Sequence, residues 1–555
     1  MRNKLIVIFF LVFISYSFSQ TVYVSSEHWV YEYLDRLEAK QYLPFVLNST
    51  KPMTRDEIAG HLKSVYQNKQ KLNRVELDQL QFLLGEFREE LPGIYSRQKT
   101  TLDRITGSKW LDPVLPDILY ANGRNLFSMS SGPMRFYWDP ILFRKRLYAN
   151  ADTLSGSERV FEDSNGFVLW GTLGQFAGFY TNVRDTREWG TRLYPGRENF
   201  TAERLGFVQG GGDQIYHDET RAYVVLNRKY FYFQFGKDKN KWGPGYSGQL
   251  ALSDWATSYD FAKLQVIAQR FKFTGLWGVL QHYEPGFFIG NHQEKYIAAH
   301  RLEFAPFDFM ELGLYETLIY SGRKFEPAYL NPVMFYRSAE HYLGDRDNAT
   351  MGLDVELKLL PNTKIYGELF IDDLTTGKLG TDFYGNKFAY LIGGYYVDAA
   401  SIPNLDVRLE YARVRPYTYS HIYDLNGYRH YTTGLGHRIG PNADDLYLEL
   451  VYRYSRRLKM KSFYEVRRHG ANADSVNTGG SMFAPHRFGD SETASFLDGI
   501  LEKTTGAGVN VSYELAREFY IRLQYNYYWA HFDRPDEQDV PGNRSEFWLQ
   551  FSLNY

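Results

Sequence analysis

The chain ends on Phe547-Trp-Leu-Gln-Phe-Ser-Leu-Asn-Tyr555, in which apolar residues occupy every second position. In an extended strand successive side chains point to opposite faces, so the apolar set shares one face and the more polar set the other. Strands with one apolar and one polar face, here closing on an aromatic residue, are typical of bacterial outer-membrane β-barrels. This stretch therefore predicts an all-β transmembrane barrel located in the outer membrane.

The same alternation recurs earlier in the chain, in residues 353–359, 405–411, 509–515 and 519–527. Charged residues occupy the alternate positions, as Glu356 and Arg408 illustrate. A charged side chain in mid-strand must face water, so the pattern predicts a wet lumen. A soluble β-sandwich also alternates, but its strands are nearer five or six residues, against about ten here.

The connections between the predicted strands alternate between long loops and tight turns. Counted back from Tyr555, the long loops are 528–544, 468–504, 415–443, 373–386 and 321–349. The turns between them are 516–517, 455–457, 402–404, 361–362 and 306–308. Because outer-membrane barrels have short periplasmic turns and long outer loops, the long loops are expected outside the cell. Continued to residue 124, the count predicts about 18 antiparallel strands and assigns residues 119–555 to the barrel.

The N-terminus predicts a secretory signal followed by helices. Residues 1–19 combine a basic start, an apolar stretch of about ten residues and small residues at the end, as in a cleaved signal peptide. In residues 20–118, apolar residues recur at helical spacing from Val30 onward. Thr54-Arg-Asp-Glu57 and Asn73-Arg-Val-Glu76 have the pattern of capping boxes that start helices. We predict a small periplasmic bundle of about three helices whose polar faces are exposed.

The composition argues against several classes of function. The chain of 555 residues has no cysteine, so no disulfide or thiolate metal site can form. Its formal net charge of −2 argues against nucleic-acid binding. Aromatic residues make up 17% of the chain, which suits the Tyr and Trp girdles of a large barrel.

Several short segments share their order and spacing with one known family. They are Val30-Tyr-Glu-Tyr-Leu-Asp-Arg-Leu37, Lys51-Pro-Met-Thr-Arg-Asp-Glu-Ile-Ala59, Gly236-Lys-Asp-Lys-Asn-Lys-Trp-Gly-Pro-Gly245, Leu250-Ala-Leu-Ser253, Asn331-Pro-Val333, Asp347-Asn348 and Tyr366-Gly-Glu-Leu-Phe-Ile-Asp-Asp-Leu374. Together they resemble the capsule-assembly Wzi family of Gram-negative outer membranes. The resemblance implies a barrel of about eighteen strands with a periplasmic helical bundle. It also implies a lectin-like protein that holds capsular or exopolysaccharide at the cell surface without catalysis.

A loop rich in glycine and aromatic residues is the first candidate for glycan contact. Trp242, Tyr246 and Trp255 offer flat apolar faces to sugar C–H groups. Lys241 and Asp254 lie nearby and can bond sugar hydroxyls. The alternative interpretation is structural, in that the same residues fold this loop into the mouth of the barrel.

A second long loop contains Tyr336, Arg337 and Arg346. An arginine can hold a carboxylate of an acidic polysaccharide through two parallel hydrogen bonds. A solvated loop, or an internal lock between arginine and aspartate, is the favoured explanation of the same residues. Asp345 and Asp347 alone are too few acidic ligands for a calcium site, so no metal is predicted.

Two carboxylate pairs, Asp372-Asp373 and Asp444-Asp445, are placed poorly for catalysis. Adjacent strand residues point to opposite faces, whereas a glycosidase needs two carboxylates across one sugar. No H-E-x-x-H or G-x-S-x-G motif appears. We therefore predict no enzyme, no catalytic residue and no cofactor, and keep a hydrolase assembled from distant strands as a third hypothesis.

Basic residues are numerous in the C-terminal third. The arginines are Arg413, Arg415, Arg453, Arg456, Arg457, Arg467 and Arg468. Because acidic residues accompany them, cross-strand charge pairs that stiffen the lumen wall are favoured over a field that selects anions.

Together these patterns predict an outer-membrane barrel that binds or anchors surface polysaccharide. The alternative, from another class, is a diffusion porin or transport channel, which the polar lumen and strand number also allow. The expected partners are surface polysaccharide, outer-membrane lipids and, during insertion, the barrel-assembly machinery. We expect a monomer that binds no nucleic acid.

Overall fold

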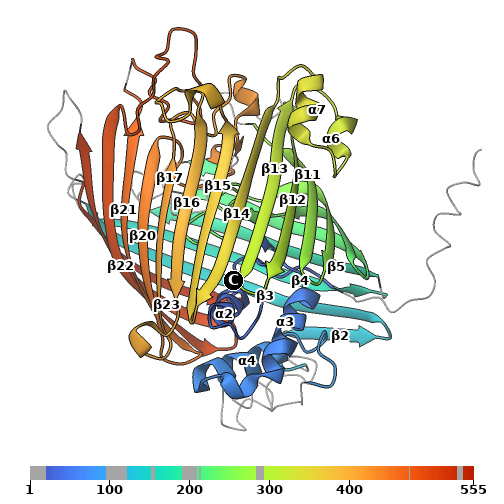
Figure 1. Ribbon diagram of the computed structural model, residues 1–555. Coiled ribbons are helices and arrows are strands. Elements are labelled where there is room, and N and C mark those ends of the chain that lie inside the picture. Colours follow the sequence, from blue (N-terminus) through green and yellow to red (C-terminus); the bar gives the residue numbers. More distant parts are fainter. Residues whose placement is uncertain are drawn as a thin grey trace, which may run out of the picture.

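The computed structural model describes residues 21–94, 122–151, 157–174, 176–190, 209–211, 214–282, 293–473, 475–533 and 542–554. The predicted signal peptide, residues 1–19, and the predicted boundary between helices and barrel near residue 119 lie outside these residues. The described residues form one closed antiparallel barrel with helices at both ends (Figure 1).

Eighteen strands make up the barrel wall in the described part of the chain, which confirms the predicted fold. They are β3 (Met134–Ala151), β4 (Ser157–Leu173), β5 (Ala177–Gly190), β7 (Gln214–Arg228), β8 (Phe231–Asp238), β10 (Tyr259–Ala268), β11 (Phe271–Leu280), β12 (Lys295–Phe307), β13 (Met310–Ser321), β14 (Asn348–Leu360), β15 (Thr363–Asp373), β16 (Lys387–Tyr396), β17 (Leu405–Val414), β20 (Ala443–Arg453), β21 (Leu458–Ala471), β22 (Ile500–Ala516), β23 (Phe519–Asp533) and β24 (Arg544–Leu553). The barrel closes where β24 pairs with β3, with Leu553 opposite Leu142. Closure leaves no exposed sheet edge, which a membrane requires of any sheet that spans it.

Short strands and helices complete the structure. The short strands are β1 (Thr50–Lys51), β2 (Phe127–Ser131), β6 (Gln209–Gly211), β9 (Lys241–Trp242), β18 (Arg429–His430) and β19 (Thr433–Gly434). The helices are α2 (Val30–Ala39), α3 (Arg55–Gln67), α4 (Arg74–Glu86), α6 (Pro327–Leu330) and α7 (Tyr336–Tyr342), with 3₁₀ turns at η1 (Lys69–Lys71), η4 (Thr376–Lys378), η5 (Ala399–Ser401) and η6 (Asp424–Asn426). No helix in the described ranges is long and apolar enough to cross a membrane.

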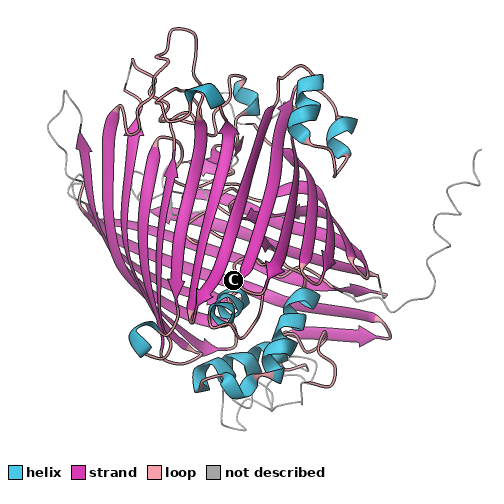
Figure 2. Ribbon diagram, viewed as in Figure 1, coloured by secondary structure: helices cyan, strands magenta, loops and turns pink. Residues whose placement is uncertain are grey.

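The long and short connections fall at opposite ends of the barrel, as the sequence predicts. Turns as short as Pro361-Asn362 and Arg517-Glu518 join strands at one end, which we call the turn end. Long connections such as residues 415–442 lie at the other end, which we call the loop end. In Figure 2, α3 and α4 lie below the turn end, whereas α6 and α7 lie at the loop end.

The N-terminal helices begin where the sequence predicts. The side chain of Thr54 accepts a hydrogen bond from the backbone of Glu57, and Asn73 does the same for Glu76, so both capping boxes are formed. The apolar faces of the helices pack into one cluster that includes Leu34. This cluster is the apolar core of the helical bundle.

The two faces of the barrel wall differ as expected, but the prediction of a wet lumen is wrong for β10–β17. Outward residues such as Leu314 and Leu409 are exposed and apolar, as a lipid-facing surface requires. Inward charged residues such as Glu356 and Asp354 are at most 3% exposed. They contact other parts of the chain instead of water, because loops and the N-terminal segment fill this part of the barrel.

Candidate functional site

The loop between β8 and β10, residues 239–258, folds into the barrel, and we call it the inward loop. Glu368 on β15 accepts hydrogen bonds from the backbone N–H of Leu250 at 3.2 Å and of Ala251 at 3.1 Å. Glu410 on β17 accepts bonds from the N–H of Tyr246 and Ser247, both at 2.8 Å. Each inward carboxylate therefore satisfies two backbone donors that would otherwise be buried without a partner.

One glycine allows the inward loop to approach the wall this closely. Gly243 has φ +121°, a conformation that L side chains rarely adopt. A Cβ at this position would lie 2.5 Å from a carboxylate oxygen of Glu368. The Trp-Gly-Pro-Gly stretch is therefore required for folding the loop against Glu368, which supports the structural interpretation of this motif.

The N-terminal segment, residues 21–54, enters the lumen from the turn end and meets the inward loop there. Strand β1 pairs with β9, so that Thr50 lies opposite Trp242. The N–H of Gly243 donates to the carbonyl of Ser49 at 2.8 Å. Wall residues hold the segment in place, as the bond from Arg301 to Thr50 at 2.9 Å shows. The inward loop is thus joined to the helical end of the molecule.

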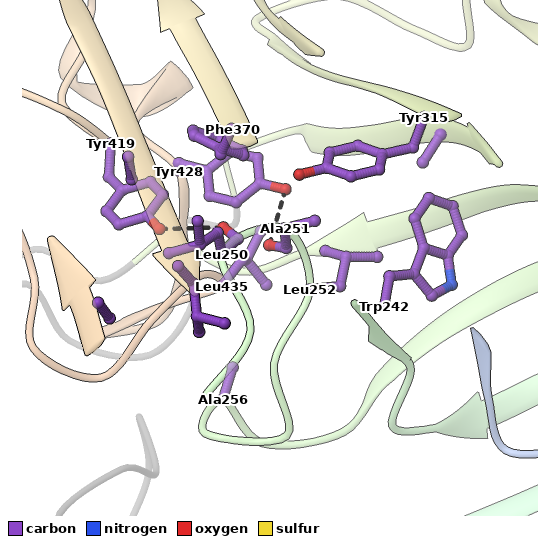
Figure 3. Close-up of a cluster of buried hydrophobic side chains, with 14 of the residues drawn as sticks. Trp242, Leu250, Ala251, Leu252, Ala256, Tyr315, Phe370, Tyr419, Tyr428 and Leu435 are labelled. Carbon is purple, nitrogen blue, oxygen red and sulfur yellow. Dashed lines mark hydrogen bonds between the residues drawn. The ribbon is translucent and has the colours of Figure 1, made fainter. Parts of the chain in front are cut away.

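The loop between β17 and β20, residues 415–442, covers the inward loop, and we call it the capping loop. Figure 3 shows Tyr419 and Tyr428 of the capping loop beside Leu250 and Ala251. The Tyr419 hydroxyl donates to the carbonyl of Leu250 at 2.9 Å, and the Tyr428 hydroxyl to that of Ala251 at 3.1 Å. The N-terminal segment, the inward loop and the capping loop therefore form a three-layered plug beside β10–β17.

Helix α2 lies against the inner wall, so the prediction that its polar face is exposed is wrong. The ammonium group of Lys364 on β15 contacts carboxylates of both Asp35 and Glu38. One turn earlier on the helix, Glu32 pairs with Lys459 at 2.9 Å and Lys461 at 3.4 Å. Burial opposes ionisation of Glu32, but these cations outweigh it and hold the pKa of this carboxyl well below its usual range. The polar face of α2 therefore contacts charged residues of the barrel wall, whereas the sequence pattern predicted contact with water.

Two groups of acidic side chains resemble metal ligands, but each is paired with a basic side chain of the protein. Carboxylate oxygens of Asp35, Glu38 and Glu356 lie within 4.8 Å of one another. The Lys364 ammonium group contacts all three, so their charge is already compensated. In the loop between β13 and β14, Asp347 pairs with Arg323 and accepts a hydrogen bond from a tyrosine hydroxyl. Arg323 was not among the arginines considered from the sequence; of those, Arg337 lies 3.6 Å from Asp345.

A cavity of about 980 Å³ remains inside the barrel, between α2, the inward loop and the wall at β20–β23. Its lining mixes both charges, including Glu32, Lys461 and Glu449. The hydroxyl of Tyr246 accepts a hydrogen bond from Lys461 at 2.7 Å at its edge. This space is polar and lies inside the barrel, on the helical side of the inward loop.

The structure places the six predicted glycan-contact residues in different environments. Trp242 is fully buried within the inward loop, and Tyr246 lines the internal cavity. Trp255 is half-buried in the inward loop, and Tyr336 is buried in α7. The two arginines lie on the loop between β13 and β14. Arg337 pairs with Glu340 at 2.8 Å, and Arg346 is exposed above the ring of Tyr423 at 5.9 Å. Trp242 and Tyr246 therefore share no outward cleft with Arg337.

An aromatic group at the loop end was not predicted from the sequence. It consists of Phe383, Tyr384, Tyr417 and His486, which come from three different loops, and we call it the loop-end cluster. The rings of Tyr384 and His486 stack with centroids 3.5 Å apart and planes within 9°. Tyr417 meets the His486 ring edge-on at 5.5 Å. The available signal was the presence of aromatic residues in long loops, but contacting rings from different loops are about 30 to 100 residues apart in sequence, which no local pattern reveals.

Hydrogen bonds hold the loops of this cluster together. The Ser495 hydroxyl donates to Asp382 at 2.9 Å, and the N–H of Ala494 donates to the carbonyl of Asp382 at 2.7 Å. The Tyr417 hydroxyl donates to the carbonyl of Asn477 at 2.8 Å. The cluster is therefore a connected surface rather than a set of independent side chains.

One known protein family matches most of this chain. The family described as "Capsule assembly protein Wzi" matches residues 158–543. The chain belongs to the Wzi family. No curated protein sequence matches it.

Three solved structures are similar to this chain to different extents. The structure of Wzi from Escherichia coli is described as an outer membrane protein involved in group 1 capsule assembly and a carbohydrate-binding β-barrel. It is similar over 95% of this chain and 98% of its own, with 14% identity and a TM-score of 0.52. OprD from Pseudomonas aeruginosa matches over 75% of this chain and 95% of its own, with 10% identity and a TM-score of 0.41. OccAB1 from Acinetobacter baumannii matches over 75% and 96%, with 9% identity and a TM-score of 0.43. The fold of this Wzi-family chain is thus shared with the E. coli Wzi barrel.

Proposed function

We propose that this Wzi-family barrel binds surface polysaccharide at the loop end and holds it on the cell surface, without catalysis. The single observation that carries the proposal is the three-layered plug, because a lumen filled by the chain's own loops suits attachment better than passage. Family membership, and the description of E. coli Wzi as carbohydrate-binding, support the same conclusion. In this proposal the loop end faces outward, and the N-terminal helices lie in the periplasm.

The loop-end cluster is the surface that we assign to the glycan. Aromatic faces pack against sugar C–H groups, and neighbouring polar groups fix the orientation of the hydroxyls. Tyr384 and His486 offer such faces, and Asp382 and Arg415 supply polar groups beside them. Trp255 and Arg346 remain candidates for further contacts on the same end of the barrel, whereas Trp242 and Tyr246 support the plug.

Direct binding of polysaccharide tests this assignment. Purified barrel is titrated with surface polysaccharide from the producing strain, and the affinity of the wild type is compared with that of Tyr384→Ala. We expect Tyr384→Ala to weaken binding about tenfold, because a sugar–aromatic contact is lost. The control is Tyr342→Ala, which removes an exposed aromatic ring from a loop outside the cluster. Equal affinity of all three proteins would rule out the cluster as the binding surface.

A channel is the second candidate function, and the polar internal cavity favours it. Reconstitution in planar bilayers separates the two functions. With the plug in place, we expect conductance well below that of an open porin, whose lumen is a water-filled channel. A steady, large current through the wild-type protein would favour the channel instead. We also expect a monomer inserted by the barrel-assembly machinery, which a single closed barrel allows.

A further inference from the structure

The loop between β13 and β14, residues 322–347, folds onto the outside of the barrel, and we call it the flap. Tyr315 and Thr317 of β13 point into the lumen, where they bond Glu368 and Tyr428 at 3.1 Å each. Successive strand residues point to opposite faces, so Glu316 points outward. The backbone N–H at the start of α7 donates to the Glu316 carboxylate at 3.0 Å. The flap is therefore attached to the outer face of the wall.

Further contacts fix the flap against the outer wall. The indole N–H of Trp277 on β11 donates to the carbonyl of Tyr329 at 2.8 Å. The ring of Tyr329 lies 5.2 Å from that of Tyr320 on β13. His300 of β12 pairs with Glu316 at 3.0 Å beneath the flap. Figure 1 shows α6 and α7 beside the upper ends of these strands.

The wall residues under the flap indicate its height relative to the membrane. Trp277, Tyr296 and Tyr320 lie within about three residues of the loop ends of their strands, and they face outward because their neighbours Leu276, Ile297 and Ile319 are buried in the lumen. Outward Trp and Tyr residues at strand ends form the girdles that lie at the membrane–water interface. The flap packs on this girdle, so it lies at the level of the outer interface.

The outer surface of the flap is apolar in spite of its exposure. Its exposed apolar residues are Phe325, Leu330, Val333, Phe335, Tyr342 and Leu343. Val333 is 82% exposed and Tyr342 is 90% exposed. The flap contains four basic residues (Arg323, Lys324, Arg337 and Arg346) and four acidic ones (Glu326, Glu340, Asp345 and Asp347). Because its formal charges balance, net charge does not draw the flap toward a charged membrane surface, whereas its exposed apolar residues favour contact with lipid.

We propose that the flap is a lipid-binding element whose apolar residues insert into the outer leaflet, at the boundary between acyl chains and headgroups. The surface is continuous with the lipid-facing wall, which is the argument for lipid as its occupant. Interfacial segments of this kind bury apolar side chains about 5–10 Å into the headgroup region. The balanced charge predicts that insertion does not require anionic headgroups. The flap would thereby fix one loop of the glycan-binding end at the membrane surface.

The absence of cysteine makes a direct test possible, because one introduced cysteine can be labelled uniquely. Val333→Cys on the flap and Phe488→Cys on the loop between β21 and β22 both replace exposed apolar residues. Each is labelled with an environment-sensitive fluorophore in the full-length protein and reconstituted in phosphatidylcholine nanodiscs, which leave both membrane faces accessible. Quenching by lipids with nitroxide-labelled acyl chains is compared with quenching by iodide in the water.

The expected result separates the two positions. Nitroxide lipids should quench the Val333→Cys label at least about threefold more strongly than the Phe488→Cys label, with the order reversed for iodide. Equal quenching of both labels by iodide, with little effect of the nitroxide lipids on either, would overturn the proposal. Heat-modifiable migration on gels shows whether each variant is a folded barrel, and a folded Leu330→Cys variant gives a second reading of the flap. Glycan binding is not part of this test, so its outcome is independent of the proposed function.

Discussion

At the scale of single residues, carboxylates that point into the lumen hold the inward loop in place. Glu368 is buried and accepts the N–H groups of Leu250 and Ala251. A buried donor left without a partner costs about 1–3 kcal/mol. Glu368→Ala should therefore destabilise the inward loop by about 2 kcal/mol or more, measured as faster amide hydrogen exchange around Leu250.

The conservative variant Glu368→Gln serves as the control, because its side-chain carbonyl still accepts a hydrogen bond. Because it keeps only one of the two acceptor oxygens, it should preserve part of the protection that Glu368→Ala loses. If the two variants exchanged equally slowly, the role assigned to this carboxylate in holding the loop would be wrong.

A second residue-scale prediction concerns pH. Burial raises the pKa of Glu340 in the flap to about 7, with Asp345 and Asp347 adding to the effect and Arg337 opposing it. A folded-state pKa above the ordinary value means that the contribution of this group to flap docking is greatest at low pH and is lost as the pH rises to about 7. Amide exchange in α7 should therefore reflect weaker docking, after correction for intrinsic rates, as the pH rises from about 4.5 to 7, with little further change above 7.

Replacing Glu340 by glutamine removes this titration. Glu340→Gln should keep the corrected protection of α7 nearly constant across the same pH range. A wild-type flap whose protection does not change with pH, or a glutamine variant that still responds, would contradict the prediction.

At the scale of elements, ion pairs hold α2 inside the barrel. Lys364 compensates Asp35, Glu38 and Glu356, all of which are partly or fully buried. Removing one partner from a buried ion pair leaves uncompensated charge and costs about 3–5 kcal/mol. Lys364→Ala should therefore loosen α2, seen as faster amide exchange over residues 30–39.

The matched control for this variant is Lys378→Ala. Lys378 pairs with Glu492 at 3.7 Å, but both side chains are well exposed. Exposed pairs contribute little, so this change should alter stability by less than about 0.5 kcal/mol. Similar effects of the two lysine substitutions would contradict the assigned role of Lys364.

The elements that could be predicted from the sequence are those whose sequence signals are local. Strand alternation and the capping box at Thr54 act within a few residues, so the barrel, its turns and its helix starts were predictable. The position of α2 was not, because its polar face has the same pattern whether it meets water or lysines hundreds of residues away. The inward path of Trp242 likewise depends on pairing with Thr50 and on the Glu368 carboxylate, which are distant in sequence.

At the scale of the whole molecule, the structure combines a lumen that is partly filled, on the β10–β17 side, with long folded loops at the loop end. The plug joins the N-terminal segment to the capping loop, so the two ends of the barrel are connected through its interior. The loop-end cluster lies on top of this arrangement, and the flap extends it over the outer wall. Each feature favours a protein that holds a polymer at the surface over one that conducts solutes.

The most direct test of this account is the partition of polysaccharide between cells and medium. The gene is deleted in the producing strain, and polysaccharide is measured on washed cells and in the culture supernatant. The account predicts that deletion shifts polysaccharide from cells to medium with the total unchanged, and that the wild-type gene restores retention. An unchanged partition in the deletion strain would contradict the central claim.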